Sequence, residues 1–306
     1  MSKVAFVFPG QGSQHPGMGK DLADNFAVAR QVFEEASDSL GIDVAKLCFE
    51  GPESDLKLTA NTQPAILTVS VAALRVISAE IGLVADYAAG HSLGEYSALV
   101  SAGALSFADA VATVRQRGLF MQEAVPVGVG TMAAIIGLDR PVLEDVCLQA
   151  AEGEVVAPAN FNSPGQVVIA GHVTAVERAM ALAKERGAKR ALALPVSAPF
   201  HCSLMLPAAE RLAEVLDGIA IGEMALPVVS NVEAQAYDDS QRVKELLVAQ
   251  VSAPVRWEES VQNMATTGVE RFVEIGPGKV LSGLVKRIAR GLALHNVEDA
   301  AGVKGL

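Results

Sequence analysis

The chain has 306 residues and a mass of 31.8 kDa, with 51% hydrophobic and 19% charged residues. This length fits one large domain with a smaller insertion, and the composition excludes a disordered chain. The formal net charge of −11 at pH 7 argues against nucleic acid or an anionic membrane as the main partner. Only 5% of the residues are aromatic. The apolar content is therefore mostly aliphatic, as in α/β proteins with helices on both faces of a sheet.

The cysteine pattern favours a reducing compartment. Cys48, Cys147 and Cys202 are scattered and form no CxxC pair, so they predict no metal site. The apolar run at 4–8 is too short for a signal peptide, and the uncharged stretch at 58–74 carries polar residues that argue against a membrane span. We therefore expect a cytoplasmic protein that binds no membrane.

Short β-rich runs alternate with amphipathic helices, a pattern that predicts a parallel sheet. The run at 4–8 predicts a first strand, which the loop at 9–14 follows. Helical periodicity covers 20–38 and 63–81, and a strand at 84–89 runs directly into Gly90-His91-Ser92-Leu93-Gly94. Further helices are expected near 93–102, 106–124, 203–217, 241–250 and 256–267, strands at 226–230, 271–275 and 292–297, and a last helix after Gly276-Pro277-Gly278.

Residues 126–197 have a different rhythm. Their pattern predicts strands and helices in the order β-α-β-β-α-β, which is the ferredoxin-like order. Prolines and glycines flank the segment on both sides, as expected at the junctions of an inserted domain. We therefore expect a large α/β-hydrolase-like catalytic domain from residues 1–125 and 198–306, with residues 126–197 as an inserted ferredoxin-like subdomain.

Residues 90–94 match the G-x-S-x-G pattern between a predicted strand and a predicted helix. That context is the one a nucleophile elbow requires, because the glycines allow a sharp turn that exposes the serine at a helix N-terminus. Ser92 is therefore a candidate nucleophile. A tight turn with a capping serine is the alternative.

A serine nucleophile needs a base, and His201 is the best placed of the five histidines. It stands where the chain returns from the insertion, a place that faces a cleft in many two-domain proteins. His91 directly precedes Ser92 and is expected to line the site, since neighbours on a turn point apart. Cys202 beside His201 is expected to be a small wall residue.

Arg117 lies on the flank of an apolar stripe in the helix predicted at 106–124. A guanidinium against the core needs an acceptor, which is either a fixed carboxylate or the carboxylate of a substrate. Gln11, between two glycines after the first strand, is placed to offer a backbone N–H to an oxyanion. The loop does not fit a dinucleotide or Walker pattern.

Several motifs together resemble one family closely, the malonyl-CoA:acyl carrier protein transacylases (FabD type). The resemblance covers essentially the whole chain. Its motifs are Gly10-Gln11-Gly12-Ser13-Gln14, Thr62-Gln63-Pro64-Ala65, Gly90-His91-Ser92-Leu93-Gly94-Glu95, Arg115-Gln116-Arg117-Gly118, Ala198-Pro199-Phe200-His201, Ser230-Asn231 and Gly276-Pro277-Gly278. Cys202 departs from the family, which usually has serine there.

The resemblance implies a role for each matching residue. Ser92 would be the nucleophile and His201 the base, oriented by the backbone carbonyl of Gln250. The backbone N–H groups of Gln11 and Leu93 would form the oxyanion hole. Arg117 would bind the malonyl carboxylate. The reaction would pass malonyl from malonyl-CoA to an acyl carrier protein through a serine ester, for fatty acid synthesis, without a cofactor or a metal.

Three further expectations concern the acyl group, the carrier protein and the oligomeric state. Phe200 is bulky and should crowd an α-methyl group, which favours malonyl over methylmalonyl. Acyl carrier proteins of this kind are acidic, so an acidic enzyme needs a basic rim. The candidates for that rim are Lys184, Arg186, Lys189, Arg190, Lys286, Arg287 and Arg290. No coiled coil or evident interface pattern appears, so a monomer is expected.

Three alternatives remain at this point. A serine hydrolase would place an acid between its serine and its histidine, and Asp109, Asp139 and Asp145 lie there, but none follows a predicted strand of the main domain. A non-catalytic relative would not need Ser92, His201 and Arg117 together. An acyltransferase of polyketide synthesis or of malonate decarboxylation would share every motif named above.

Overall fold

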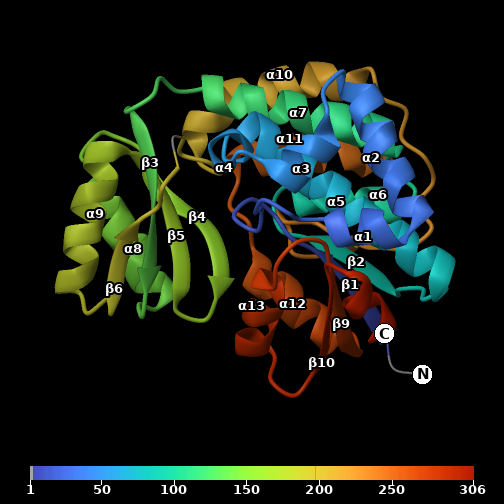
Figure 1. Ribbon diagram of the computed structural model, residues 1–306. Coiled ribbons are helices and arrows are strands. Elements are labelled where there is room, and N and C mark those ends of the chain that lie inside the picture. The colour runs from blue at the N-terminus through green and yellow to red at the C-terminus, as the bar shows by residue number, and fades with distance from the viewer. Residues whose placement is uncertain (1–2, 197) are drawn as a thin grey trace.

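The computed structural model describes residues 3–196 and 198–306, whose strands form two separate sheets (Figure 1). The larger sheet has six strands in the order β10-β9-β1-β2-β7-β8. All neighbouring pairs are parallel except β7 with β8. The strands are β1 (Lys3–Phe8), β2 (Tyr87–Gly90), β7 (Val228–Val229), β8 (Ala236–Tyr237), β9 (Val269–Ile275) and β10 (Ala293–Val297).

Helices cover both faces of this sheet, as the composition predicts (Figure 1). They are α1 (Lys20–Asn25), α2 (Ala27–Leu40), α3 (Val44–Glu50), α4 (Glu53–Leu56), α5 (Thr59–Glu80), α6 (Gly94–Ser101), α7 (Phe107–Glu123), α10 (Leu206–Asp217), α11 (Val243–Ser252), α12 (Trp257–Thr266), α13 (Val280–Ile288) and α14 (Ala300–Lys304), with short 3₁₀ turns at Ser203–Met205 and Ser240–Arg242.

Successive side chains of β1 belong to different cores, because side chains alternate between the faces of a strand. Phe6 and Phe8 pack in the core that contains α5 and α7, whereas Ala5 and Val7 pack in the core of α12 and α13. Helix α5 is long and apolar enough to span a membrane by length and composition, but 78% of its most apolar window is buried within the protein. It is therefore the central helix of the core.

The smaller sheet has four antiparallel strands in the order β4-β5-β3-β6. Its elements are β3 (Gly130–Ile136), α8 (Arg140–Ala151), β4 (Val156–Ser163), β5 (Gln166–His172), α9 (Val173–Glu185) and β6 (Arg190–Ala193). This is the ferredoxin-like arrangement, so the predicted fold class is confirmed. Ala133 and Ile135 of β3 pack under α8 and α9, whereas Met132 faces the core of the large sheet.

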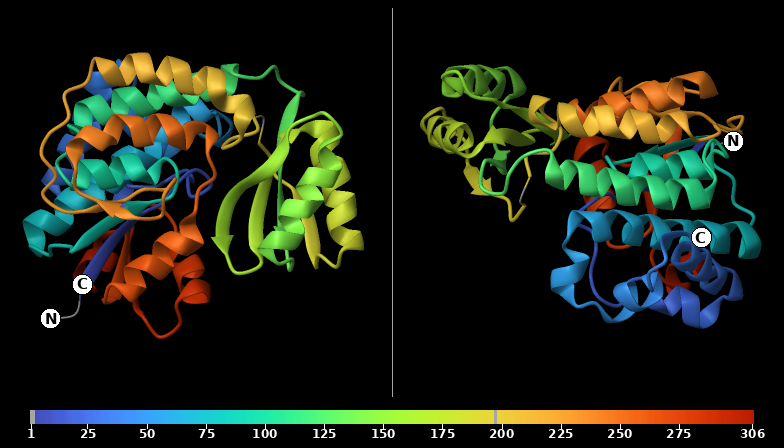
Figure 2. Two further views of the ribbon diagram at one scale, coloured as in Figure 1. Left: turned by 180° about the vertical axis from the view of Figure 1, so that it is seen from behind. Right: turned by 90° about the horizontal axis from the view of Figure 1, so that it is seen from above.

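The segments that link the two parts lie close together at one end of the small sheet (Figure 2). Gly130, at the start of β3, lies against the ring of Pro199 on the returning chain. The boundaries of the insertion at 126 and 197 stay predictions, and Ser197 lies outside the described residues.

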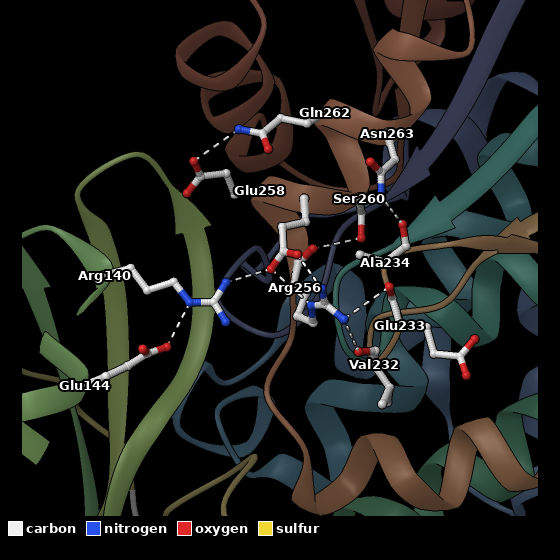
Figure 3. A network of polar contacts seen from close by, with 11 residues as sticks. Arg140, Glu144, Val232, Glu233, Ala234, Arg256, Glu258, Ser260, Gln262 and Asn263 are labelled. Atoms are coloured by element: carbon white, nitrogen blue, oxygen red, sulfur yellow. Dashed lines mark hydrogen bonds and ion pairs between the residues drawn. The ribbon is translucent and has the colours of Figure 1, made fainter. Parts of the chain in front are cut away.

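Strand β4 attaches the small sheet to the large part along a second seam. The backbone N–H of Phe161 donates to the Val255 oxygen (2.8 Å), and the Val255 N–H donates to the Ala159 oxygen (2.9 Å). Arg140 of α8 pairs with Glu259 of α12 at 2.8 Å (Figure 3). The Arg140 guanidinium also stacks on the Phe161 ring. The insertion is therefore joined to the large part by backbone pairing as well as by its two linkers.

The structure differs from the sequence-based prediction in one divided helix and in four elements that were not expected. The helix predicted at 20–38 is two helices, because Phe26 has extended backbone (φ −128°, ψ 123°). Helices α3 and α4 were not expected, nor was β8, which has only two residues. The last helix is α14 rather than the helix that follows Gly278. Each missed element is seven residues or shorter, too short to show a clear hydrophobic period.

Candidate active site

The chain turns sharply at Ser92, between the end of β2 and the start of α6. Ser92 has a positive φ of 50°, a conformation that is uncommon and strained for non-glycine residues and that clusters at active sites. A Cβ at Gly90 would overlap the backbone of Gly94, and a Cβ at Gly94 would overlap the carbonyl of Phe8 at the end of β1. Both glycines are therefore needed for this turn, and the predicted nucleophile elbow is the local structure.

His201 approaches Ser92 from the segment that returns from the small sheet. Its Nε2 lies 2.8 Å from Ser92 Oγ, and its Nδ1 lies 2.9 Å from the backbone oxygen of Gln250, near the end of α11. Like Ser92, His201 has a positive φ (61°), and its side chain is buried. Ser92, His201 and Gln250, which are far apart in the sequence, thus form a continuous chain of hydrogen bonds.

Arg117 reaches the same serine from α7. Its Nη2 donates to Ser92 Oγ (3.1 Å) and to Gln250 Oε1 (2.9 Å), and its Nη1 donates to Gln63 Oε1 (2.9 Å). The residue is 1% exposed, and none of the carboxylates in residues 3–196 and 198–306 forms an ion pair with it. The first of the two acceptors considered for Arg117, a fixed carboxylate, is therefore not found among the described residues. The guanidinium instead lies beside the candidate nucleophile and has neutral hydrogen-bond partners.

A cavity opens above Ser92, between the large part and the small sheet. It receives side chains from both, including Met132 of β3 and Asn160 of β4. The full lining is Gln11, Gln63, His91, Ser92, Leu93, Arg117, Met121, Met132, Asn160, Leu194, Val196, Phe200 and His201. Gln11, Leu93, His91 and Phe200, all singled out from the sequence, thus face the same space as Ser92.

The two residues that flank the catalytic candidates have structural contacts. His91 lines the cavity, and its Nε2 lies 2.8 Å from the Asn162 side-chain oxygen of β4, so it links the elbow to the small sheet. Its burial lowers its pKa. Cys202 is 2% exposed and its Sγ lies 3.2 Å from the Pro199 oxygen, in keeping with a wall residue. Burial raises the pKa of its thiol to about 11, so it is a poor nucleophile.

The environment of His201 lowers its pKa to about 3. Burial is the largest cause, the positive charge of Arg117 adds to it, and the hydrogen bond to the Gln250 carbonyl acts in the opposite direction. A neutral carbonyl behind the ring, unlike a carboxylate, adds no negative charge that would raise the pKa of His201. In the structure the lowering comes from burial and from Arg117.

Sequence reasoning missed three residues of this site, although all three lie in motifs that it quoted. The Asn231 side-chain oxygen accepts from the Ser92 backbone N–H (2.6 Å), and its amide donates to the Gly90 oxygen (2.6 Å). Gln63 holds Arg117, as described above. Glu95 is buried under the elbow and accepts from Gln250 Nε2 at 2.7 Å. Gln63 stands among the polar residues Thr59, Asn61 and Thr62 at the start of α5, so its place in the Thr62-Gln63-Pro64-Ala65 motif is the signal that could have identified it.

The turn that carries Asn231 is supported by the ion-pair network of the seam (Figure 3). Arg256 Nη1 donates to the backbone oxygens of Val232 and Glu233, both at 3.2 Å, and the Asn263 amide donates to the Ala234 oxygen at 2.7 Å. Arg256 also pairs with Glu259, the partner of Arg140. The same network therefore joins the small sheet and the turn behind Ser92.

Comparison with known proteins shows the family of this chain. Residues 5–303 match the family model described as acyl transferase domain. The chain is 54% identical over 300 residues to a protein of Bacillus subtilis named malonyl CoA-acyl carrier protein transacylase, covering 98% of this chain and 94% of the relative. The chain belongs to this acyltransferase family.

Solved structures of transacylases are similar along the whole chain. The malonyl CoA-acyl carrier protein transacylase of Coxiella burnetii has a TM-score of 0.98 at 45% identity, covering 99% of this chain and 96% of that one. A malonyl-transacylase in complex with a type II polyketide acyl carrier protein has a TM-score of 0.97 at 51% identity, covering 99% and 98%. Membership in the acyltransferase family therefore rests on sequence and on fold.

The basic residues expected at the rim of this acyltransferase are all exposed. Lys184, Arg186, Lys189 and Arg190 lie at the end of α9 and the start of β6, and Lys286, Arg287 and Arg290 lie at the end of α13. Arg186 pairs with Asp145 at 3.1 Å, and Arg287 donates to the Gln166 side chain of β5 at 2.6 Å. The basic residues at the end of α13 thus contact the small sheet through Arg287.

The three aspartates of the hydrolase alternative lie elsewhere in the acyltransferase fold. Asp109 accepts from Ser106 in the first turn of α7, Asp139 precedes α8 and Asp145 lies within α8. The Nδ1 atom of His201, where a hydrolase would have its acid, contacts the Gln250 carbonyl. Within residues 3–196 and 198–306, no group of three or more His, Cys, Asp or Glu side chains is arranged to hold a metal ion.

Proposed function

We propose that this acyltransferase moves the malonyl group from malonyl-CoA to the phosphopantetheine thiol of an acyl carrier protein through a malonyl ester on Ser92. The observation that supports this most directly is the position of Ser92 Oγ, within hydrogen-bond distance of both the His201 imidazole and the Arg117 guanidinium. The first group can remove the serine proton, and the second can bind a carboxylate on the acyl group.

The first half-reaction forms the ester. Ser92 Oγ attacks the thioester carbonyl of malonyl-CoA while its proton passes to His201 Nε2. The resulting oxyanion accepts from the backbone N–H groups of Gln11 and Leu93, each worth about 3–4 kcal/mol in related sites. When the C–S bond breaks, the CoA sulfur leaves and takes the proton from His201. A thiol is a good leaving group, so a weakly basic imidazole is sufficient.

The second half-reaction reverses these steps with a different thiol. The phosphopantetheine thiol of the carrier protein gives its proton to His201 and attacks the ester carbonyl. The C–O bond to Ser92 breaks, and Ser92 Oγ regains the proton from His201. The products are the malonyl thioester of the carrier and free enzyme, so no cofactor or metal is consumed. This is a ping-pong mechanism.

Arg117 and Phe200 would select the acyl group. The malonyl carboxylate is two bonds from the reacting carbonyl carbon, so a guanidinium 3.1 Å from Ser92 Oγ can reach it. Phe200 lines the cavity and would crowd a methyl group on the α-carbon. The variant F200S should therefore raise methylmalonyl transfer relative to malonyl transfer. An unchanged ratio would contradict this role of Phe200.

The carrier protein would dock on the basic rim defined above by its seven lysines and arginines. Support comes from their exposure and from the similar transacylase whose structure contains an acyl carrier protein. Charge reversal at Lys189 and Arg190 should weaken transfer to the carrier and reduce its dependence on salt. Formation of the serine ester should not change. Transfer that is insensitive to both changes would refute this docking site.

The deciding experiment is intact-protein mass spectrometry after mixing with malonyl-CoA. Wild-type protein should gain one malonyl group, S92A should gain none, and holo acyl carrier protein should remove the label. If CoA and malonate appear quickly without a labelled protein, the chain is a hydrolase.

We also propose that the enzyme supplies fatty acid synthesis, that it acts in the cytoplasm and that it is a monomer. The proposed role in fatty acid synthesis is tested by comparing the rates of malonyl transfer to carrier proteins of fatty acid synthesis and of polyketide synthesis.

A further inference from the structure

Glu95 is a fully buried acid that takes no part in the reaction proposed above. It lies in the first turn of α6, three residues after Ser92, and is 0% exposed. One carboxylate oxygen, Oε2, accepts from Gln250 Nε2 (2.7 Å) and from the Asn231 backbone N–H (3.1 Å). The other, Oε1, has no hydrogen-bond partner in the described part of the chain. A buried acid is costly, so its presence under the nucleophile calls for a function.

The contacts of Gln250 show what this carboxylate does. The Gln250 Nε2 group donates to Glu95 Oε2 and to the Ser92 backbone oxygen (2.9 Å), and Gln250 Oε1 accepts from Arg117 (2.9 Å). If the amide were rotated by half a turn, its NH₂ would face the donors of Arg117 and its oxygen would face two acceptors. The acceptors at Glu95 and Ser92 therefore select one orientation of the amide.

Arg117 needs that orientation, because its charge is buried among neutral partners. A carboxylate in direct contact with Arg117 would satisfy the guanidinium and compete with the carboxylate of a substrate. In this structure one amide separates Glu95 from Arg117. The Glu95 carboxyl group thus holds the amide oxygen toward Arg117 without occupying the guanidinium. The same residue, Gln250, also holds His201 through its backbone oxygen.

We propose that Glu95 is a positioning residue that holds the Gln250 side-chain amide in the orientation that directs Arg117 to a carboxylated acyl group. This inference rests on the proposed function, in which Arg117 binds the malonyl carboxylate. It adds a residue that touches neither the substrate nor the reacting atoms and yet sets which acyl group is accepted.

The electrostatics of the region support a link between the two charges. Burial raises the pKa of Glu95 to about 7, whereas the hydrogen bonds from Gln250 and Asn231 and the charge of Arg117 act in the opposite direction. Tyr96 of α6 and Tyr237 of β8 also interact electrostatically with this carboxyl, and burial raises the pKa of both. The positive charge that acts on Glu95 comes from Arg117.

The test compares malonyl-CoA with acetyl-CoA as donors for labelling of Ser92, measured by rapid quench and intact mass. E95A removes both hydrogen bonds, and E95D retains the charge but withdraws it from Gln250. Each should lower malonyl labelling on the order of 30-fold, as for a lost hydrogen bond to a charged group, and acetyl labelling far less. E95Q retains an acceptor for both bonds and should return malonyl labelling to within about threefold of wild type.

Glu274 provides a matched control. It is also 0% exposed, and its carboxylate accepts from the backbone N–H groups of Leu281 and Ser282 at the start of α13. E274Q should lower the melting temperature without changing the malonyl-to-acetyl ratio. If E95A yields no folded protein, the malonyl-to-acetyl labelling ratio of E95D is compared with that of wild type.

Two results would overturn the inference. Equal loss of malonyl and acetyl labelling would mean that Glu95 supports the elbow but not Arg117, and an unchanged ratio in E95D would mean that the contact with Gln250 has no role. Labelling of S92A would instead refute the proposed function, so the two failures are distinguishable.

Discussion

His201 Nδ1 lies 2.9 Å from the backbone oxygen of Gln250. A carbonyl oxygen only accepts hydrogen bonds, so Nδ1 carries the ring proton and the lone pair of Nε2 faces Ser92 Oγ, 2.8 Å away. The contact therefore sets the tautomer that a base requires without placing a second negative charge behind the ring. Burial and Arg117 then hold the pKa of the imidazole low.

The first prediction concerns the pH dependence of ester formation. Because the pKa of His201 is lowered to about 3, the base is already neutral at pH 5. The rate of Ser92 labelling by malonyl-CoA should change by less than about twofold between pH 7 and pH 5. A histidine of ordinary pKa would lose about 25-fold over this range. Single-turnover rates at both pH values distinguish the two, and a loss of that larger size would contradict the structure.

The second prediction concerns acid stability. The unfolded chain binds a proton at His201 below pH 6.5 and the folded chain does not until pH is close to 3, so the folded state loses stability as pH falls through this window. Glu95 has the opposite effect on stability. Because burial raises its pKa, the folded chain binds a proton at Glu95 more readily than the unfolded chain does, and this favours folding as pH falls.

The contribution of His201 is therefore measured as a difference between variants. Urea unfolding at pH 7 and at pH 5 should show a smaller loss of stability in H201Q than in wild type. H15Q, in the first loop, is the control and should behave as wild type. Equal losses in wild type and H201Q would show that His201 is protonated in the folded state.

The third prediction tests the carboxylate-binding role of Arg117. R117A should lower the rate of malonyl labelling of Ser92 by about 100-fold, because a buried hydrogen-bonded charge is lost, and should lower acetyl labelling much less. Arg115 is the matched control on the same helix, since it donates to the Ala60 backbone oxygen. R115A should leave the ratio of the two donors unchanged. A ratio that R117A does not alter would assign the binding of the carboxylate to another residue.

The fourth prediction concerns the elbow. A Cβ at Gly94 would overlap the Phe8 carbonyl, so G94A must displace either β1 or the start of α6. It should destabilise the protein by about 3 kcal/mol or more and prevent labelling of Ser92. Gly283, in α13, has no atom within 4 Å of an added Cβ. G283A should instead stabilise the protein by about 1 kcal/mol, as measured by urea unfolding.

The main elements and the candidate chemistry could be predicted from the sequence alone. Strands and helices of ordinary length carry their periodicity locally, so the β-α-β-β-α-β insertion and the strand that enters Gly90-His91-Ser92-Leu93-Gly94 could be predicted from short windows. The elbow could be predicted for the same reason, since its glycines and its serine are consecutive. The break at Phe26 could not, because a single extended residue leaves the hydrophobic period on both sides nearly unchanged.

Which polar groups meet at Ser92 depends on the folded chain and could not be predicted. Asn231 and Gln250 contact it from positions 139 and 158 residues away, and Gln63 and Glu95 act through Arg117 and Gln250. Such contacts leave no local pattern, because they depend on where the ends of parallel strands and the helices above them come together. The low pKa of His201 is likewise a property of burial and of a charge from another helix, which only the folded chain supplies.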